Sequence, residues 1–237
     1  MTDARDHLVL PLDVPDLETA RARAKALAPW YATAKIGYEL WAGVGPAAVD
    51  ALHEDGFAVF VDLKLLDIPT TVERAARVLG RRGAEFVNLH AVGGLEMLRA
   101  GVAGLADGAR DGGHPPCRAL AVTVLTSEAD ASAVDKRLGI ARAAGCDGVV
   151  CAAAEAAAAR ALHLAPMVPG VRLAGTAAHD QTRVATPHEA IHAGAEWLIV
   201  GRSVTEADDP PRAAARLTAE VDAALHEAGA PGRHRDR

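Results

Sequence analysis

Eight short apolar runs recur along the chain, and a stretch of helix-forming residues follows each of them. Within the runs, hydrophobic and β-branched residues are nearly continuous and do not alternate with polar ones. This pattern is typical of strands that are buried on both faces, as in a parallel sheet. The runs span residues 8–13, 33–38, 58–64, 85–91, 118–125, 148–152, 165–171 and 197–203.

The segments between the runs are rich in Ala, Leu, Arg and Glu, and several end in a glycine of the kind that closes helices. Helices are predicted over 16–28, 45–56, 71–83 and 135–145, and a brief one within 155–163. Eight strand–helix units in 237 residues favour a single-domain (β/α)8 barrel of the TIM-barrel class over an open doubly wound sheet. We expect the barrel over residues 1–228 and a disordered C-terminal tail over 229–237.

Composition excludes several classes of function. A formal net charge of −6 and only 3% aromatic residues argue against nucleic-acid binding. No apolar run approaches the ~20 residues that span a bilayer, so no membrane association is expected. The first residues lack a secretion-signal pattern, and the cysteines (Cys117, Cys146 and Cys151) are odd in number and irregularly spaced. These features predict a cytoplasmic protein with buried, reduced thiols.

Polar residues stand where the predicted strands end, which is where barrel enzymes place their active sites. The densest cluster is Asp62-x-Lys64-x-x-Asp67 at the end of the third run. Residues two apart in a strand point to the same side, so Asp62 and Lys64 are expected inside the barrel, with Asp67 in the following loop. Lys35 of the neighbouring run would complete an array of two ammonium groups and two carboxylates. Each ammonium group would keep the neighbouring carboxylates ionised, and each carboxylate would keep the neighbouring ammonium groups protonated. The alternative interpretation is a buried salt bridge that only stabilises the fold, although desolvation makes such pairs poor stabilisers.

A second cluster lies toward the C-terminus, in the phrases VPGVR (168–172), DQTR (180–183) and VGRS (200–203). The loops after strands seven and eight usually bind phosphate in these barrels. Glycine lets backbone N–H groups approach an anion, and arginine offers a bidentate fork to phosphate oxygens. The candidate phosphate ligands are Arg172, Gln181, Arg183, Gly201 and Arg202, some of which are equally interpretable as surface residues.

No cofactor or metal is predicted from the motifs. The sequence has no zinc, haem or flavin signature and no glycine-rich dinucleotide motif after a first strand. His179, His188 and His192 have no nearby carboxylate pattern that would complete a metal triad, and His188 and His192 are interpreted as one helix face. His90, at the end of the fourth run, is interpreted as a hydrogen-bonded wall residue.

The chain resembles the orotidine 5′-monophosphate decarboxylase family in several sequence segments, which occur in the same order as in the family. They are AKIGYEL (34–40), VFVDLKLLDIPTTV (59–72), VNLHAVGG (87–94), AVTVLTS (121–127), VPGVRLAG and HDQTRVATPHEAI (within 168–191) and LIVGRSV (198–204). The sequence departs from the pattern at Leu66 and Thr70, where many members have histidine and asparagine.

The resemblance implies a role for each matching residue. Lys35, Asp62, Lys64 and Asp67 correspond to the family's charged tetrad, in which the last aspartate and, by its position, Thr71 reach the partner subunit's site. A homodimer with shared active sites is therefore implied. The remaining matches are Asp13 for the ribose hydroxyls, Thr126 or Ser127 for the pyrimidine ring, and Arg172, Gln181 and Arg202 for the phosphate and its closing loop.

The implied reaction is the decarboxylation of orotidine 5′-monophosphate to uridine 5′-monophosphate without cofactor or metal, in pyrimidine biosynthesis. A sugar-phosphate decarboxylase, aldolase or epimerase of the same barrel type is the alternative enzyme, and its chemistry generally needs a metal at an enediolate. A barrel that only senses a nucleotide is the non-enzymatic alternative, which would need Arg202 but not Lys64.

Overall fold

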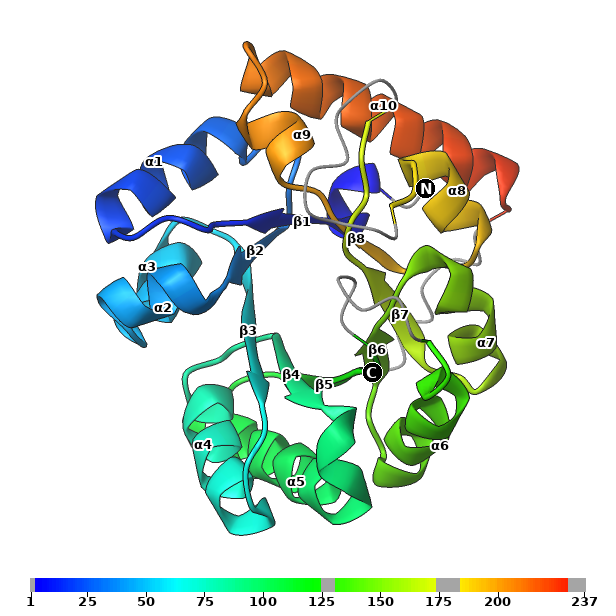
Figure 1. The fold of residues 1–237 in the computed structure, drawn as a ribbon. Helices are drawn as coiled ribbons and strands as arrows, with labels where there is room; N and C mark the ends of the chain where they lie inside the picture. The colour runs from blue at the N-terminus through cyan, green and yellow to red at the C-terminus, as the bar shows by residue number, and fades with distance from the viewer. Residues whose placement is uncertain (1–2, 125–130, 174–183, 230–237) are drawn as a thin grey trace.

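Eight parallel strands close into a barrel in the order β1 to β8, with β8 pairing back onto β1 (Figure 1). The structure is a computed structural model and describes residues 3–124, 131–173 and 184–229. The predicted (β/α)8 TIM barrel is confirmed. The strands are β1 (Leu8–Pro11), β2 (Thr33–Ile36), β3 (Ala58–Leu65), β4 (Phe86–His90), β5 (Arg118–Val122), β6 (Gly148–Val150), β7 (Ala165–Val168) and β8 (Trp197–Ile199).

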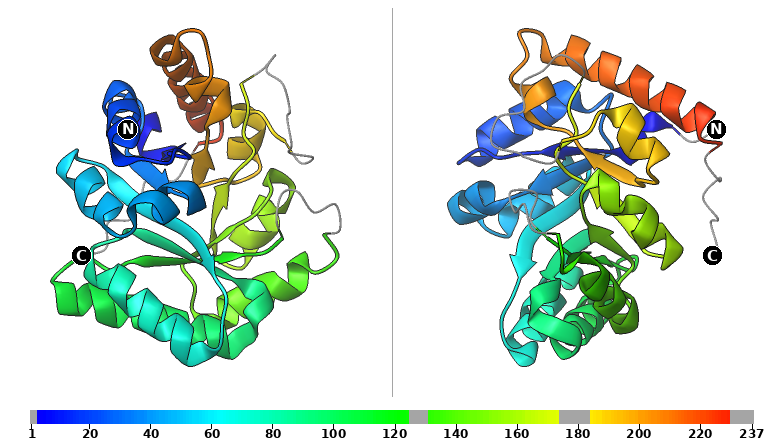
Figure 2. Two further views of the ribbon diagram at one scale, coloured as in Figure 1. Left: turned by 60° about the vertical axis from the view of Figure 1, so that its left-hand side comes forward. Right: turned by 45° about the vertical axis from the view of Figure 1, so that its right-hand side comes forward.

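Helices surround the barrel and cover the outer face of each strand (Figures 1 and 2). The α-helices are α1 (Leu17–Leu27), α2 (Tyr38–Val44), α3 (Ala47–Glu54), α4 (Pro69–Arg81), α5 (Gly94–Gly112), α6 (Val134–Ala144), α7 (Ala156–Ala161), α8 (Pro187–His192), α9 (Arg202–Thr205) and α10 (Pro210–Glu227). Three short 3-10 helices, η1 (Ala4–His7), η2 (Ala91–Gly93) and η3 (Ala153–Glu155), complete the described elements. The predicted helices over 16–28, 45–56, 71–83 and 135–145 correspond to α1, α3, α4 and α6, and the brief one to η3 and α7.

Two local expectations differ from the structure. The second strand ends at Ile36, because Gly37 caps a helix that begins at Tyr38 and that the apolar pattern did not indicate. Helix α4 begins at Pro69, two residues before the predicted start, since proline at the first helical position loses no hydrogen bond.

No helix was predicted over the residues of α5, and the glycines in this helix explain why. A Cβ atom at Gly104 would lie 2.3 Å from the carbonyl oxygen of Glu73, and one at Gly108 would lie 2.1 Å from that of Arg77. Both carbonyls belong to α4, so the absence of side chains lets the two helices pack backbone against backbone. The glycines serve helix packing, although they lower helix propensity.

The N-terminal end of the barrel is filled by aromatic side chains. Phe86 packs edge-on against Phe60 at 6.3 Å and against Trp197 at 4.9 Å between ring centroids. The guanidinium of Arg118 lies over Phe86 and Trp197, 5.2 and 5.7 Å from the two centroids. This end of the barrel is therefore a packed core, which leaves the opposite end for a site.

Among the described residues, no helix is long and apolar enough to cross a membrane. The predicted tail begins at Gly229, and its residues 230–237 lie outside the described part of the chain.

Candidate active site

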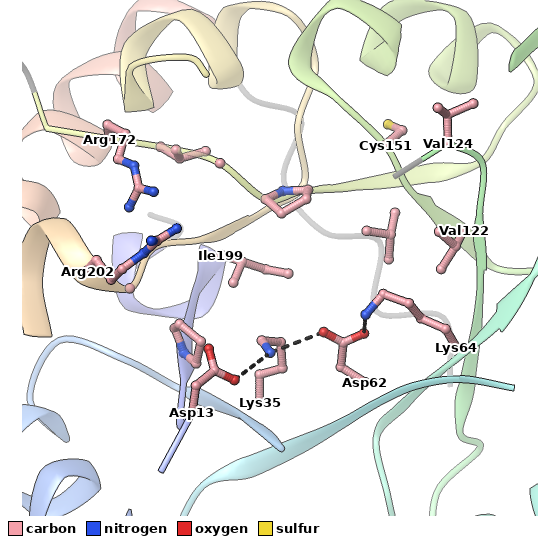
Figure 3. Close-up of a pocket in the computed structure, with 16 residues that line it drawn as sticks. Asp13, Lys35, Asp62, Lys64, Val122, Val124, Cys151, Arg172, Ile199 and Arg202 are labelled. Carbon is pink, nitrogen blue, oxygen red and sulfur yellow. Dashed lines mark hydrogen bonds and ion pairs between the residues drawn. The ribbon is translucent and has the colours of Figure 1, made fainter. Parts of the chain in front are cut away.

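A pocket opens at the C-terminal ends of the strands (Figure 3). Seven of the residues singled out from the sequence line it, although they come from five different strands or the loops that follow them. They are Asp13, Lys35, Asp62, Lys64, Arg172, Gly201 and Arg202. The closure of the barrel is what brings these distant parts of the sequence together.

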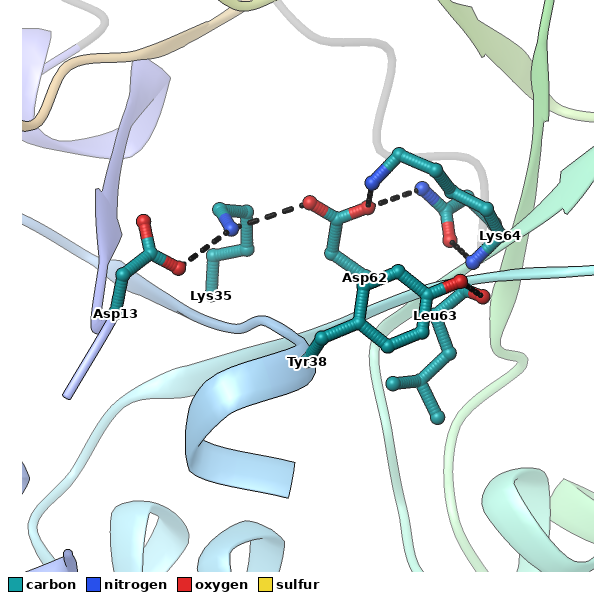
Figure 4. A network of polar contacts seen from close by, with 7 residues as sticks. Asp13, Lys35, Tyr38, Asp62, Leu63 and Lys64 are labelled. Atoms are coloured by element: carbon teal, nitrogen blue, oxygen red, sulfur yellow. Dashed lines mark hydrogen bonds and ion pairs between the residues drawn. The ribbon is translucent and has the colours of Figure 1, made fainter. Parts of the chain in front are cut away.

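Four charged side chains form a continuous row along one wall of the pocket (Figure 4). The Nζ atom of Lys35 lies 3.3 Å from Oδ1 of Asp13 and 3.1 Å from Oδ2 of Asp62. On the far side, Nζ of Lys64 lies 2.6 Å from Oδ1 of Asp62. Carboxylates and ammonium groups thus alternate, and the formal charge of the row is zero.

The row differs in one member from the array expected from residue spacing. Its second carboxylate is that of Asp13, whereas Asp67 is exposed and accepts a hydrogen bond from the backbone N–H of Ile68 at 2.7 Å. Asp67 precedes α4, on which Thr71 is also exposed. Within one chain, the structure therefore does not bring Asp67 or Thr71 to the charged row.

The backbone of β3 is irregular where it supplies two of these side chains. Its pairing with β4 shifts register between Val61 and Leu65, and Lys64 has a left-handed backbone with φ of 47°. The N–H of Lys64 donates to the side-chain oxygen of Asn88 at 2.6 Å, which holds this conformation. Asp62 and Lys64 both face the pocket, as predicted, but through a distorted strand and not a regular one.

Asn88 is a site residue that the sequence reasoning missed. It is fully buried on β4, and its side-chain nitrogen donates to Oδ1 of Asp62 at 2.6 Å. One amide thus orients both the Asp62 carboxylate and the backbone that carries Lys64. The available signal was a polar residue in the middle of the apolar run 85–91. In a strand buried on both faces, a polar side chain costs free energy unless it has a hydrogen-bond partner.

Burial and charge act in opposite directions on the central pair. Burial alone raises the pKa of Asp62, but the ammonium groups of Lys35 and Lys64 outweigh it and lower the pKa below its usual range. Burial alone lowers the pKa of Lys35, but attraction to Asp62 and Asp13 outweighs it and raises the pKa. Both groups are therefore charged at neutral pH, as the sequence analysis expected.

Gly37 leaves room for the ion pair between Asp13 and Lys35, at the opposite end of the row from Lys64. A Cβ atom at this position would lie 2.6 Å from Oδ1 of Asp13 and 3.2 Å from Nζ of Lys35. Any larger residue would displace the ion pair. The next residue, Tyr38, donates a hydrogen bond from its hydroxyl to the carbonyl oxygen of Leu63 at 2.7 Å, and its ring centroid lies 5.7 Å from Nζ of Lys64.

Two arginines lie across the pocket from the charged row (Figure 3). Arg172 follows β7 and is buried, and Arg202 follows β8 at the start of α9. Apolar side chains, including those of Val122, Val150 and Ile199, line the rest of the pocket. The pocket is therefore suited to a ligand whose anionic group meets the arginines and whose other groups meet the charged row and the apolar side chains.

Other predicted residues either fall outside the described part of the chain or are not among the residues that line the pocket. Thr126, Ser127, His179, Gln181 and Arg183 are outside the described residues. His90 is not in the pocket lining, and its ring nitrogen accepts a hydrogen bond from the N–H of Val92 at 3.3 Å, which fits the wall role expected for it.

The helix face expected for His188 and His192 is confirmed, and the structure adds a neighbour to it. They do share one face of a helix, α8, with ring centroids 4.2 Å apart. However, the structure adds a carboxylate that the spacing did not indicate, because Glu227 lies far away in the sequence. The three side chains form a group whose ligand atoms lie within 4.8 Å of one another.

Comparison with known proteins agrees with this geometry. The family model described as "Orotidine 5'-phosphate decarboxylase / HUMPS family" matches residues 6–217. A protein of Anaeromyxobacter sp. (strain K) named orotidine 5'-phosphate decarboxylase is 45% identical over 231 residues, covering 90% of this chain and 97% of its own length. A protein of the same name from Moorella thermoacetica is 41% identical over 236 residues, covering 92% and 93%.

Solved structures are similar over the same extent. The crystal structure of orotidine 5'-phosphate decarboxylase from Lactobacillus acidophilus has a TM-score of 0.78 and 29% sequence identity, covering 91% of this chain and 98% of that one. An uncharacterized conserved protein from Geobacillus kaustophilus has a TM-score of 0.77 and 34% identity, covering 90% and 99%.

Proposed function

The chain belongs to the orotidine 5'-phosphate decarboxylase / HUMPS family, and we propose that the row Asp13–Lys35–Asp62–Lys64 is its catalytic apparatus. The enzyme removes carbon dioxide from orotidine 5′-monophosphate and yields uridine 5′-monophosphate, a step of pyrimidine biosynthesis. The observation that carries the residue assignment is a row of alternating charges in the same pocket as two arginines.

The polarity of the pocket orients the nucleotide. The phosphate binds at Arg172 and Arg202, because a guanidinium fork matches phosphate oxygens. The pyrimidine then lies against the apolar side chains with its carboxylate toward Asp62 and Lys64. Asp13 and Lys35 lie between these two ends and contact the ribose hydroxyls. Thr126, Ser127 and Gln181 remain predicted ligands of the ring and the phosphate.

The chemical difficulty is a carbanion at ring carbon six. The bond from this carbon to the carboxylate breaks, its electron pair stays on the ring, and carbon dioxide leaves. Lys64 stabilises the developing negative charge and then donates a proton to carbon six, after which water reprotonates the amine. Its ammonium group, held by Asp62 at 2.6 Å, supplies both functions from one position.

Asp62 contributes by repulsion. Its lowered pKa keeps it ionised, so the substrate carboxylate is placed next to a like charge that is relieved as carbon dioxide departs. The binding energy of the remote phosphate holds the substrate in this position. Lys35 and Asn88 keep the Asp62 carboxylate in place and are positioning residues.

We further propose that the active form is a homodimer in which Asp67 and Thr71 complete the partner's site. The supporting observation is a group of exposed apolar side chains around these residues, with exposed fractions of 52% for Leu66, 66% for Ile68 and 54% for Val92. Large exposed apolar groups clustered on one face are typical of interfaces. Asp67 cannot contribute to catalysis in its own chain from where it lies, and a shared site would give it a role.

The cysteines support the cytoplasm as the proposed location. Cys117, Cys146 and Cys151 are all buried and are not joined in a disulfide. Burial raises the pKa of Cys146 to about 12, so this thiol is inert. Proteins with free thiols and no disulfide are typical of reducing compartments.

A direct assay tests the reaction. Purified protein is mixed with orotidine 5′-monophosphate in the presence of a metal chelator, and loss of the substrate's absorbance is followed. Turnover that the chelator does not change is expected for this chemistry. An activity that requires added divalent metal, or that acts on a sugar phosphate in preference to the nucleotide, would favour the alternative enzymes of the same barrel type.

A further inference from the structure

The group formed by His188, His192 and Glu227 lies on the outer surface, away from the pocket. The two histidines project from α8, and Glu227 is the last residue of α10, which runs beside α8 (Figure 1). None of the three lines the pocket. Side-chain exposed fractions of 49%, 37% and 58% leave the group open to ions from solution.

The local sequence holds both histidines in position. Thr186 caps α8 by accepting the N–H of Glu189, whose carboxylate accepts the N–H of Thr186 at 2.8 Å in return. Pro187 occupies the first turn, where its fixed φ favours the helix. Since residues four apart in a helix face the same side, the two imidazoles lie one above the other with 37° between their planes.

The three ligand atoms are close enough together to reach one ion, since all lie within 4.8 Å of one another. Nε2 of His188 lies 2.9 Å and Nε2 of His192 lies 3.4 Å from the same oxygen, Oε2 of Glu227. Ligands about 2.0–2.1 Å from a tetrahedral zinc ion are separated by about 3.3–3.4 Å. The three atoms therefore need only small side-chain rotations to surround one ion, with the open side left to water.

We propose that His188, His192 and Glu227 bind a divalent transition-metal ion of the zinc class and thereby clamp α8 to the end of α10. Two imidazoles and one carboxylate form a borderline donor set that favours such ions over magnesium or calcium, which prefer oxygen ligands. The C-terminal end of the 18-residue helix α10 also carries partial negative charge, which favours a cation beside Glu227.

A histidine–glutamate contact without a metal would also join the two helices. The two possibilities differ in whether a metal ion adds stability and whether it needs all three residues.

The test uses the full chain, freed of metal and titrated with Zn²⁺ by calorimetry, and with Co²⁺ as a spectroscopic probe. The expected result is one equivalent per chain, a visible Co²⁺ absorption band and a rise in the unfolding temperature. His188→Ala and His192→Ala should each weaken zinc binding at least tenfold and abolish the band, and Glu227→Gln should weaken binding severalfold.

His226→Ala is the matched control. His226 is an exposed histidine of α10, the helix that carries Glu227, and its ring nitrogen hydrogen-bonds instead to the carbonyl oxygen of Asp222 at 2.7 Å. This variant should bind zinc like the unmodified chain. Equal zinc affinity in the His188→Ala and control variants, or no binding by the unmodified chain at all, would overturn the proposal.

Decarboxylation is measured in parallel and should stay within twofold in every variant, with or without zinc. The metal site and the catalytic assignment are thus tested separately, because loss of zinc binding with full turnover contradicts neither the family nor the charged row. Zinc-dependent turnover that is lost in His188→Ala would contradict the structural role proposed here.

Discussion

The ammonium group of Lys64 lies 2.6 Å from a carboxylate oxygen of Asp62 that also accepts a hydrogen bond from Asn88 at 2.6 Å. The other oxygen of Asp62 meets Lys35 at 3.1 Å. Both oxygens are thus held, and the carboxylate has little freedom to turn away from a substrate of like charge. This arrangement underlies the predictions below.

Replacing Lys64 by alanine should abolish catalysis. The side chain is assigned both electrostatic stabilisation and proton donation, so kcat should fall by about 10⁴-fold or more while the fold survives. Steady-state kinetics and circular dichroism measure the two effects. Lys25→Ala is the control, since Lys25 is an exposed lysine of α1 that pairs with Asp55. Turnover of Lys64→Ala within about tenfold of the unmodified enzyme would reject the assigned role.

The strained backbone of Lys64 predicts a difference between two inactive variants. A non-glycine residue in the left-handed region costs about 1–2 kcal/mol, and glycine avoids this cost. Lys64→Gly should therefore have a higher free energy of unfolding than Lys64→Ala, by about 1 kcal/mol. Urea denaturation of the two proteins measures it. Equal stabilities would mean that the left-handed conformation is not maintained in solution.

Removing Asn88 should slow catalysis and change its pH dependence. The hydrogen bond from Asn88 helps to lower the pKa of Asp62, so Asn88→Ala should raise that pKa and move the acidic limb of kcat/KM to higher pH. Loss of a hydrogen bond to a charged group corresponds to about a 10- to 100-fold fall in kcat. Thr123→Ala, which removes a buried hydroxyl elsewhere in the barrel, is the control. An unshifted pH profile would restrict Asn88 to a purely structural role.

Replacing Asp62 by asparagine should give the free energy of unfolding a pH dependence below pH 10.5 that Lys35 does not produce in the unmodified protein. In the unmodified protein the pKa of Lys35 is raised, so the stability that it contributes is fully present below pH 10.5 and is lost only above it. In Asp62→Asn the main attraction is gone, and burial lowers the pKa of Lys35 below 10.5. The unfolded chain then binds more protons, and the free energy of unfolding should rise with pH, by at most about 1.4 kcal/mol per unit.

Urea denaturation at several pH values between 7 and 10 measures this slope. Asp50→Asn, which removes an exposed partner of Arg82, supplies the control for loss of one surface carboxylate. The same slope in Asp62→Asn and in the control would mean that Lys35 is not held charged by Asp62.

Mixed dimers test the proposed sharing of sites. Lys64→Ala and Asp67→Ala should each be inactive alone. If a site takes Lys64 from one chain and Asp67 from the other, each mixed dimer has one intact site, and re-equilibrated mixtures should recover about a quarter of full activity. Mixtures that stay inactive while mixed dimers are present would mean that each site takes Lys64 and Asp67 from the same chain, or does not use Asp67, and would reject the proposal.

The sequence was informative about the barrel because each strand has its own continuous apolar run, and about the site because the ends of those runs are polar. Features that depend on contacts between distant segments were not accessible in this way. Asn88 and the left-handed Lys64 act through a register shift between β3 and β4. Glu227 is 35 residues beyond His192, and only the packing of α10 against α8 reveals their proximity. The pairing of Lys35 with Asp13 likewise needs the close approach that Gly37 permits.

The packed aromatic floor of the barrel has a consequence for the release of products. Phe86, Trp197 and Arg118 fill the end opposite the pocket, so in the described part of the barrel carbon dioxide released in the proposed active site would leave through the mouth by which the nucleotide enters. The nucleotide and the departing gas therefore share one opening, and a ligand that fills this opening would delay escape of the gas.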